Sequence, residues 1–136
     1  MFRDFNDNMY AQISAFNSGE SPLNAWLVTP GVDLSGLNTA LFSFGTKDGF
    51  NNGDALKAYI STDFSGDPTT ATWTELTEAN LATGTNSGYA SSFTYSGNLD
   101  LSAYIDQTVY IGFEYTGAAN GVTTTYQIDN VAFFAN

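Results

Sequence analysis

The sequence predicts an all-β fold, and three observations support this prediction. Aromatic residues make up 15% of the 136 residues and charged residues only 12%, so the chain has enough apolar surface for a core. Threonine, tyrosine and phenylalanine favour strands, whereas glycine, asparagine and serine favour turns, and both groups are abundant. Short segments of alternating polarity recur between clusters of turn residues, a spacing typical of a sandwich or a barrel.

Eight segments have the composition and alternation of strands. They are residues 9–16, 25–29, 39–46, 55–62, 72–77, 91–96, 108–116 and 123–134. The breaks at 17–22, 48–54 and 65–68 are rich in turn-forming residues, and a short helical turn is expected only near 77–81. Since no proline- or glycine-rich linker divides the sequence, we expect residues 1–136 to form a single β-sandwich module.

Alternation also predicts which side chains face the core. In residues 55–62 and 108–116, every second side chain is predicted to point inward (Leu56, Ala58 and Ile60; Val109, Ile111, Phe113 and Tyr115). Three further sets are also predicted to face the core (Phe42 with Phe44, Phe93 with Tyr95, and Trp26). The parity of the apolar residues changes near Asp129 and Asn130, which predicts a β-bulge in the last strand.

The composition excludes several classes of function. Three Lys and Arg residues against 14 Asp and Glu residues give a net charge of −11, which opposes binding to nucleic acid phosphates. The chain has no Cys and no His, so it can form neither a disulfide, a zinc finger nor a catalytic triad that uses histidine. Its longest apolar runs are too short to span a membrane as a helix.

A surface rich in Thr, Ser and Asn but poor in Lys is common in exported proteins. Residues 1–20 contain no basic segment followed by an apolar one, so no signal peptide is recognised. We therefore expect a secreted or cell-surface protein, of which this chain is a mature or excised part.

A carbohydrate site is the first functional hypothesis. Aromatic rings stack on the apolar faces of sugars, while polar side chains bind the sugar hydroxyls. Alternation turns both kinds of residue outward on two consecutive predicted strands that could pair (Lys57, Tyr59, Trp73 and Glu75). Tyr110 and Glu114, on the predicted strand 108–116, have the same character. The alternative is that Trp73 covers one end of the sandwich and Tyr59 packs on a neighbouring loop.

Catalysis by paired carboxylates is a weaker hypothesis. Most acidic residues fall in turns or at strand ends, where they favour solvated turn conformations. Glu75 and Glu114 lie in the middle of predicted strands, but nothing in the sequence brings them together as glycosidase carboxylates. We therefore expect no enzymatic activity.

Seven short segments resemble one known family in order along the chain. They begin at Tyr10, Ala25, Ala55, Ala71, Leu99, Thr108 and Gln127, and include Ala25-Trp-Leu-Val-Thr-Pro-Gly-Val-Asp-Leu-Ser-Gly and Gln127-Ile-Asp-Asn-Val. This pattern resembles the choice-of-anchor J domains of exported Bacteroidetes proteins, which are related to cleaved-adhesin and meprin-type domains. The resemblance covers about residues 10–134.

The resemblance implies a jelly-roll, galactose-binding-like sandwich that serves as a non-catalytic accessory module. Similar domains bind polysaccharide, on a sheet face or at loop tips. Others act as adhesive spacers that contact neighbouring domains, and this is the alternative function. Members usually begin with an additional acidic strand. Here that strand is either missing or shortened to residues 2–5, and a missing strand would leave an open edge.

A structural calcium ion is a further hypothesis. Residues 4–8 place oxygen ligands such as Asp4 and Asn6 at alternating positions, although Met9 and Ala15 break the EF-hand pattern. Asp48–Asp54 is also rich in oxygen atoms but has the composition of an ordinary turn. The resemblance implies a calcium ion that ties an N-terminal acid to the last strand, at Asp129. The alternative is that Asp129 accepts backbone hydrogen bonds at the bulge.

Overall fold

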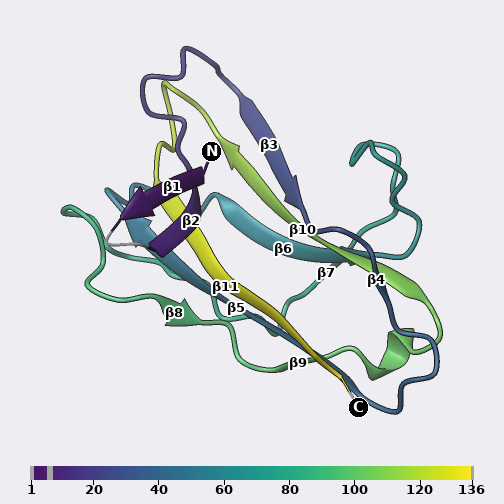
Figure 1. The fold of residues 1–136 in the computed structure, drawn as a ribbon. Coiled ribbons are helices and arrows are strands. Elements are labelled where there is room, and N and C mark those ends of the chain that lie inside the picture. The colour runs from purple at the N-terminus through teal and green to yellow at the C-terminus, as the bar shows by residue number, and fades with distance from the viewer. Residues whose placement is uncertain (1, 6–7, 136) are drawn as a thin grey trace.

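The molecule is a sandwich of two antiparallel β-sheets (Figure 1). The structure, a computed structural model, describes the backbone of residues 2–5 and 8–135 and the side chains of residues 10–135. Within that part of the chain the only helical segment is the 3-10 turn Ser102–Tyr104, and no helix is long and apolar enough to cross a membrane. The predicted all-β sandwich of the jelly-roll class is confirmed.

The first sheet, named the β5 sheet here, contains both ends of the described chain. Its strands run in the order β1-β2-β11-β5-β8, with β9 also paired to β5. The bounds of these strands are Phe2–Phe5, Asn8–Ile13, Thr125–Ala135, Ala40–Gly49 and Thr94–Tyr95, with Leu99–Asp100 for β9. Figure 1 shows β11 and β5 running side by side, as their long register also requires.

The second sheet, named the β10 sheet, contains most of the residues that were predicted to bind carbohydrate. Its strands run in the order β3-β10-β6-β7, with β4 also paired to β10. Their bounds are Leu23–Val28, Thr108–Gly117, Leu56–Ser61 and Thr74–Glu75, with Val32–Asp33 for β4. Strand β10 therefore has neighbours on both sides and fixes the register of the sheet.

Each of the eight predicted segments overlaps a strand, and the differences lie in the shortest elements. Strands β4 and β9 were not predicted, because two residues show no alternation. Strand β1 occupies residues 2–5, where one of the two alternatives placed a shortened strand. Near 77–81, where a short helical turn was expected, the chain forms one hydrogen-bonded turn, from Ala79 N to Leu76 O, and no helix.

The predicted inward faces of β6 and β10 are confirmed. Val109, Ile111, Phe113 and Tyr115 are at most 2% exposed and pack against Phe42 and Phe44 of the opposite sheet. The prediction that Phe93 and Tyr95 face the core is wrong. Both lie on the outer face of the β5 sheet, where Tyr95 is opposite Gly45 and 57% exposed. The short strand β8 has too few residues for its alternation to indicate a face.

The bulge predicted in the last strand is confirmed. The pairing of β11 with β5 shifts between Asp129 and Ala132, and Asn130 adopts a positive φ of 54°. The shift reverses the side-chain parity, so that Phe133 lies opposite Phe42, with their ring centroids 4.6 Å apart. Without the bulge, one end of β11 would turn its apolar side chains to solvent.

Two buried tyrosines tie the sheets to the loops at one end of the sandwich. The hydroxyl of Tyr115 accepts a bond from Ala15 N at 3.0 Å and donates one to Thr124 O at 2.7 Å. The hydroxyl of Tyr126 accepts a bond from Ala55 N at 3.0 Å. Burial raises the pKa of both phenols, and the bond from Ala15 lowers that of Tyr115 in part.

Replacing Tyr115 by Phe is expected to lower the free energy of unfolding by about 2–3 kcal/mol, because Ala15 N–H and Thr124 C=O would lose a buried partner. Urea unfolding followed by circular dichroism measures this. The matched control is Tyr126→Phe, which removes the acceptor of Ala55 N and should cost less. Equal stability of Tyr115→Phe and the wild type would contradict the assignment.

Candidate functional site

The six residues that were predicted to bind carbohydrate lie together on the outer face of the β10 sheet. Residues directly opposite on neighbouring strands point to the same side of a sheet. Glu114 of β10 lies opposite Lys57 of β6, and Tyr59 of β6 lies opposite Glu75 of β7. Tyr110 precedes Glu114 by four residues on the same face of β10. Trp73, just before β7, folds onto this face beside them.

Five aromatic side chains form a continuous group on this face, which we name the outer aromatic cluster (Trp26, Tyr59, Phe64, Trp73 and Tyr110). The rings of Trp26 and Trp73 are nearly parallel, at 24°, with centroids 4.9 Å apart. Tyr59 packs against Trp26 at 5.5 Å, and Phe64 lies between Trp73 and Tyr110, at 5.8 and 5.3 Å. All five side chains are half-buried, so each ring is held by another and still reaches solvent.

The cluster depends on the missing side chain of Gly112. A Cβ atom at this position would lie 2.9 Å from Cη2 and Cζ3 of Trp73 and 3.1 Å from Cε3 of Trp26. Both indoles therefore rest directly on the backbone of β10. Trp73 is fixed there by a 2.8 Å bond from its Nε1 to Pro68 O, within the loop that connects β6 to β7.

Polar groups border the outer aromatic cluster. Glu114 Oε2 accepts a 2.8 Å bond from Asn24 Nδ2, and Lys57 Nζ lies 3.9 Å from Glu75 Oε1. The pKa of Tyr59 is raised, first by burial and then by the charge of Glu114 and the hydrogen bond to it. Lys57 and Glu75 are 61% and 42% exposed, so their ion pair is open to exchange for a ligand.

A shallow cavity of about 340 Å³ adjoins the cluster at the end of β6. It is lined by Asp54, Ala55, Leu56, Lys57, Glu114 and Thr116. Carboxylates, an ammonium group and a hydroxyl thus face this space, which shares Lys57 and Glu114 with the polar border of the outer aromatic cluster. This combination suits a ligand that has both hydroxyl groups and apolar ring faces.

Trp26, Asn24 and Phe64 belong to this face but were not predicted for it, and the prediction that Trp26 lies in the core is wrong. Trp26 lies opposite Glu114, and therefore points outward with it, whereas Leu27 packs against the core. The sequence feature that could have shown this is Leu27, because neighbouring residues of a strand point to opposite faces and an inward Leu27 requires an outward Trp26. The packing of both rings differs from the alternative in its partners, since Trp73 covers Gly112 of β10 and Tyr59 contacts Trp26 of β3.

The three predicted calcium ligands are only partly described. Asn6 lies outside the described residues, and Asp4 is described in its backbone alone, within β1. Asp129 lies at the bulge of β11, separated from β1 by β2, and its Oδ1 accepts a 2.8 Å bond from Asn130 N. This bond is of the kind that the alternative for Asp129 predicts, and the calcium ion stays a prediction.

Replacing Gly112 by Ala is expected to displace the two indoles, because the new methyl group overlaps Trp73. Overpacking of this kind costs about 1–3 kcal/mol, and the emission of the tryptophans should shift to longer wavelength. Gly121→Ala is the matched control, since its Cβ would lie 3.4 Å from Cβ of Ala118, an ordinary contact. An unchanged spectrum and melting temperature in Gly112→Ala would contradict the packing described.

Comparison with known proteins gives structural similarities at low sequence identity. No curated protein matches the chain. The K3 cleaved adhesin domain of Lys-gingipain from Porphyromonas gingivalis w83 is similar, with 16% identity, a TM-score of 0.49, and 95% of this chain and 75% of that chain covered.

Two carbohydrate-binding modules are similar as well. One is a CBM28 module specific for non-crystalline cellulose, with 12% identity, a TM-score of 0.43, and coverage of 98% and 78% of the two chains. The other is a CBM4 module, with 12% identity, a TM-score of 0.40, and coverage of 99% and 88%. Residues 12–135 match the family described as "Domain of unknown function (DUF5017)". The chain belongs to this family.

Proposed function

We propose that the chain is a non-catalytic accessory module that binds a polysaccharide on the outer face of the β10 sheet. The observation that carries this proposal is the convergence of the outer aromatic cluster with Lys57, Glu75 and Glu114 on one face. Its rings offer apolar surface to the faces of sugar rings, and its polar groups offer partners to their hydroxyls.

Preorganisation supports the proposal. The rings of the cluster are held by one another, by Gly112 and by the bond from Trp73 to Pro68 O. A ligand that binds there orders few side chains, so less of its contact energy is lost to conformational entropy. The net charge of −11 opposes acidic polysaccharides, and we therefore propose a neutral glycan.

The proposed setting is a secreted or cell-surface bacterial protein. The resemblance to choice-of-anchor J domains of exported Bacteroidetes proteins supports this setting, as does the surface rich in Thr, Ser and Asn. In that setting the domain holds a longer protein against its glycan. The two mid-strand acids fit a binding role, because Glu75 pairs with Lys57 and Glu114 with Asn24.

A structural or adhesive spacer is the second candidate function. The half-burial of the rings favours it, since Trp26 and Trp73 cover part of each other. A spacer would use such a face to contact a neighbouring domain rather than a sugar. The two functions differ in one measurable property, which is affinity for an isolated polysaccharide.

Affinity electrophoresis in gels that contain soluble neutral polysaccharides tests the proposal. Tyr59→Ala and Trp73→Ala are each expected to weaken retention about tenfold, as a lost stacking contact of about 1.4 kcal/mol implies. Phe16→Ala is the matched control, because Phe16 is 69% exposed and is not part of the cluster. Melting temperatures establish that each variant is folded.

The outcomes separate the two functions. Retention that both substitutions weaken supports a glycan-binding face on the β10 sheet. Retention that neither weakens contradicts this location. Absence of retention across a panel of neutral polysaccharides contradicts glycan binding and favours the spacer.

A further inference from the structure

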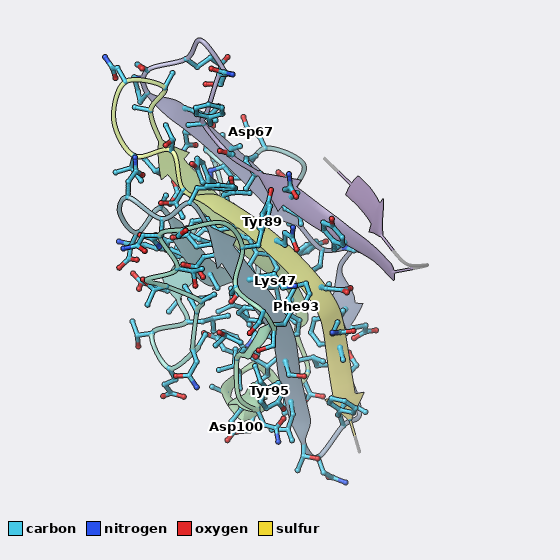
Figure 2. The ribbon with its side chains drawn as sticks, turned by 90° about the vertical axis from the view of Figure 1, so that its left-hand side faces the viewer. Lys47, Asp67, Tyr89, Phe93, Tyr95 and Asp100 are labelled. Carbon is cyan, nitrogen blue, oxygen red and sulfur yellow. The ribbon has the colours of Figure 1, made fainter. Side chains whose placement is uncertain are left out.

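The outer face of the β5 sheet, opposite the outer aromatic cluster, carries a second line of aromatic side chains. Tyr89, Phe93 and Tyr95 follow the direction of β5, and Lys47 lies among them (Figure 2). We name these four residues the β5 stripe. Tyr89 is 45% exposed and Tyr95 57% exposed, so both residues are open to solvent.

Two side chains of the stripe pack on the backbone of β5 at glycines. A Cβ atom on Gly49 would lie 2.6 Å from Cδ1 of Tyr89, and one on Gly45 would lie 3.3 Å from Cβ of Phe93. Tyr89 therefore rests against the backbone of the strand and is still 45% exposed. Gly45 and Gly49 are four residues apart, which corresponds to about 13 Å along a strand.

The end of the stripe at Tyr89 is held rigidly. Phe50, 54% exposed, packs edge-to-face on Tyr89 at 5.4 Å, although its φ of 48° is unfavourable for a phenylalanine. Its backbone N–H donates to Gly88 O at 2.9 Å. Buried Asp48 accepts a 2.8 Å bond from Thr85 N and so fixes the same loop. Strain of this kind persists where the surroundings enforce it, and it clusters at ligand sites.

Polar groups lie beside the stripe at the same level of the sheet. Lys47 Nζ lies 4.8 Å from the ring centroid of Phe93, a cation–π contact. Gln127 of β11 is opposite Lys47, and its Nε2 donates a 3.1 Å bond to Gln12 Oε1 on β2. Gln127 is only 7% exposed, so Lys47 is the polar group that this part of the stripe offers to a hydroxyl-bearing ligand.

We propose that the β5 stripe is a second binding site for a neutral polysaccharide chain, which lies along β5 from Tyr89 to Tyr95. This inference rests on the proposed function, because it assumes that the module binds glycans. The distance between Gly49 and Gly45 suits a polymer rather than a single sugar, since one sugar ring is too small to contact both ends. With sites on opposite faces, one domain would bridge two glycan segments, and linked contacts would increase its avidity.

The same full-length chain, with substitutions on either face, tests the inference. The stripe variant combines Tyr89→Ala with Tyr95→Ala, and Lys47→Met is a second variant that keeps most of the aliphatic side chain on Phe93. The variant of the opposite face is Tyr59→Ala, and Phe16→Ala is the control for loss of an exposed aromatic ring. Affinity electrophoresis uses hydroxyethylcellulose as the neutral polymer and polygalacturonate as the acidic one, with melting temperatures as the test of folding.

We expect the stripe variant to weaken retention by hydroxyethylcellulose about tenfold, Lys47→Met to weaken it severalfold, and polygalacturonate to retain neither variant nor wild type. Retention that Tyr59→Ala weakens but the two stripe variants leave unchanged would overturn this inference and leave the proposed function standing. Retention that only the stripe variants weaken would support a site on this face and contradict the location proposed on the β10 sheet. A wild-type chain that no neutral polymer retains would overturn both.

Discussion

The alternation of β10 is the constraint on which the rest of the structure depends. Its inward residues, Val109 to Tyr115, fill the core between the sheets, and its outward residues support the outer aromatic cluster. Because β10 has β3 on one side and β6 on the other, its register sets which residues of both neighbours share the outer face. A shift by one residue would exchange core and surface throughout the sheet. Stability and the proposed site therefore depend on the same strand.

Glycine has the same role on both outer faces. Gly112 lets Trp73 and Trp26 lie on β10, and Gly49 lets Tyr89 lie on β5. Trp73 comes from the loop between β6 and β7, and Tyr89 from the segment between β7 and β8, and each places its ring on the backbone of a strand. The two faces differ in exposure, since the rings on β10 cover one another whereas Tyr89 and Tyr95 reach solvent.

Alternation was sufficient to predict eight of the eleven strands in the described part of the chain, the inward residues of β6 and β10, and the bulge near Asp129. It also predicted that Lys57, Tyr59, Tyr110 and Glu114 face outward, because they lie in strands whose opposite face is apolar. Glu75 was predicted to face outward because it precedes Leu76, which packs against the core. Alternation did not predict the outward position of Trp26, because the residues on both sides of it in β3 are also apolar. It did not predict the outward positions of Phe93 and Tyr95, because the strand there, β8, has only two residues. Contacts that depend on loop paths, such as that of Phe64 with Trp73, have no period in the sequence to reveal them.

Tryptophan fluorescence is the most direct test of a glycan site on the β10 sheet. The chain has two tryptophans, and both belong to the outer aromatic cluster, so their emission reports on this face and not on the β5 stripe. Titration with a soluble neutral polysaccharide that retains the protein is predicted to change this emission in a saturable way. A polysaccharide that retains the protein but leaves the emission unchanged throughout the titration would contradict the account.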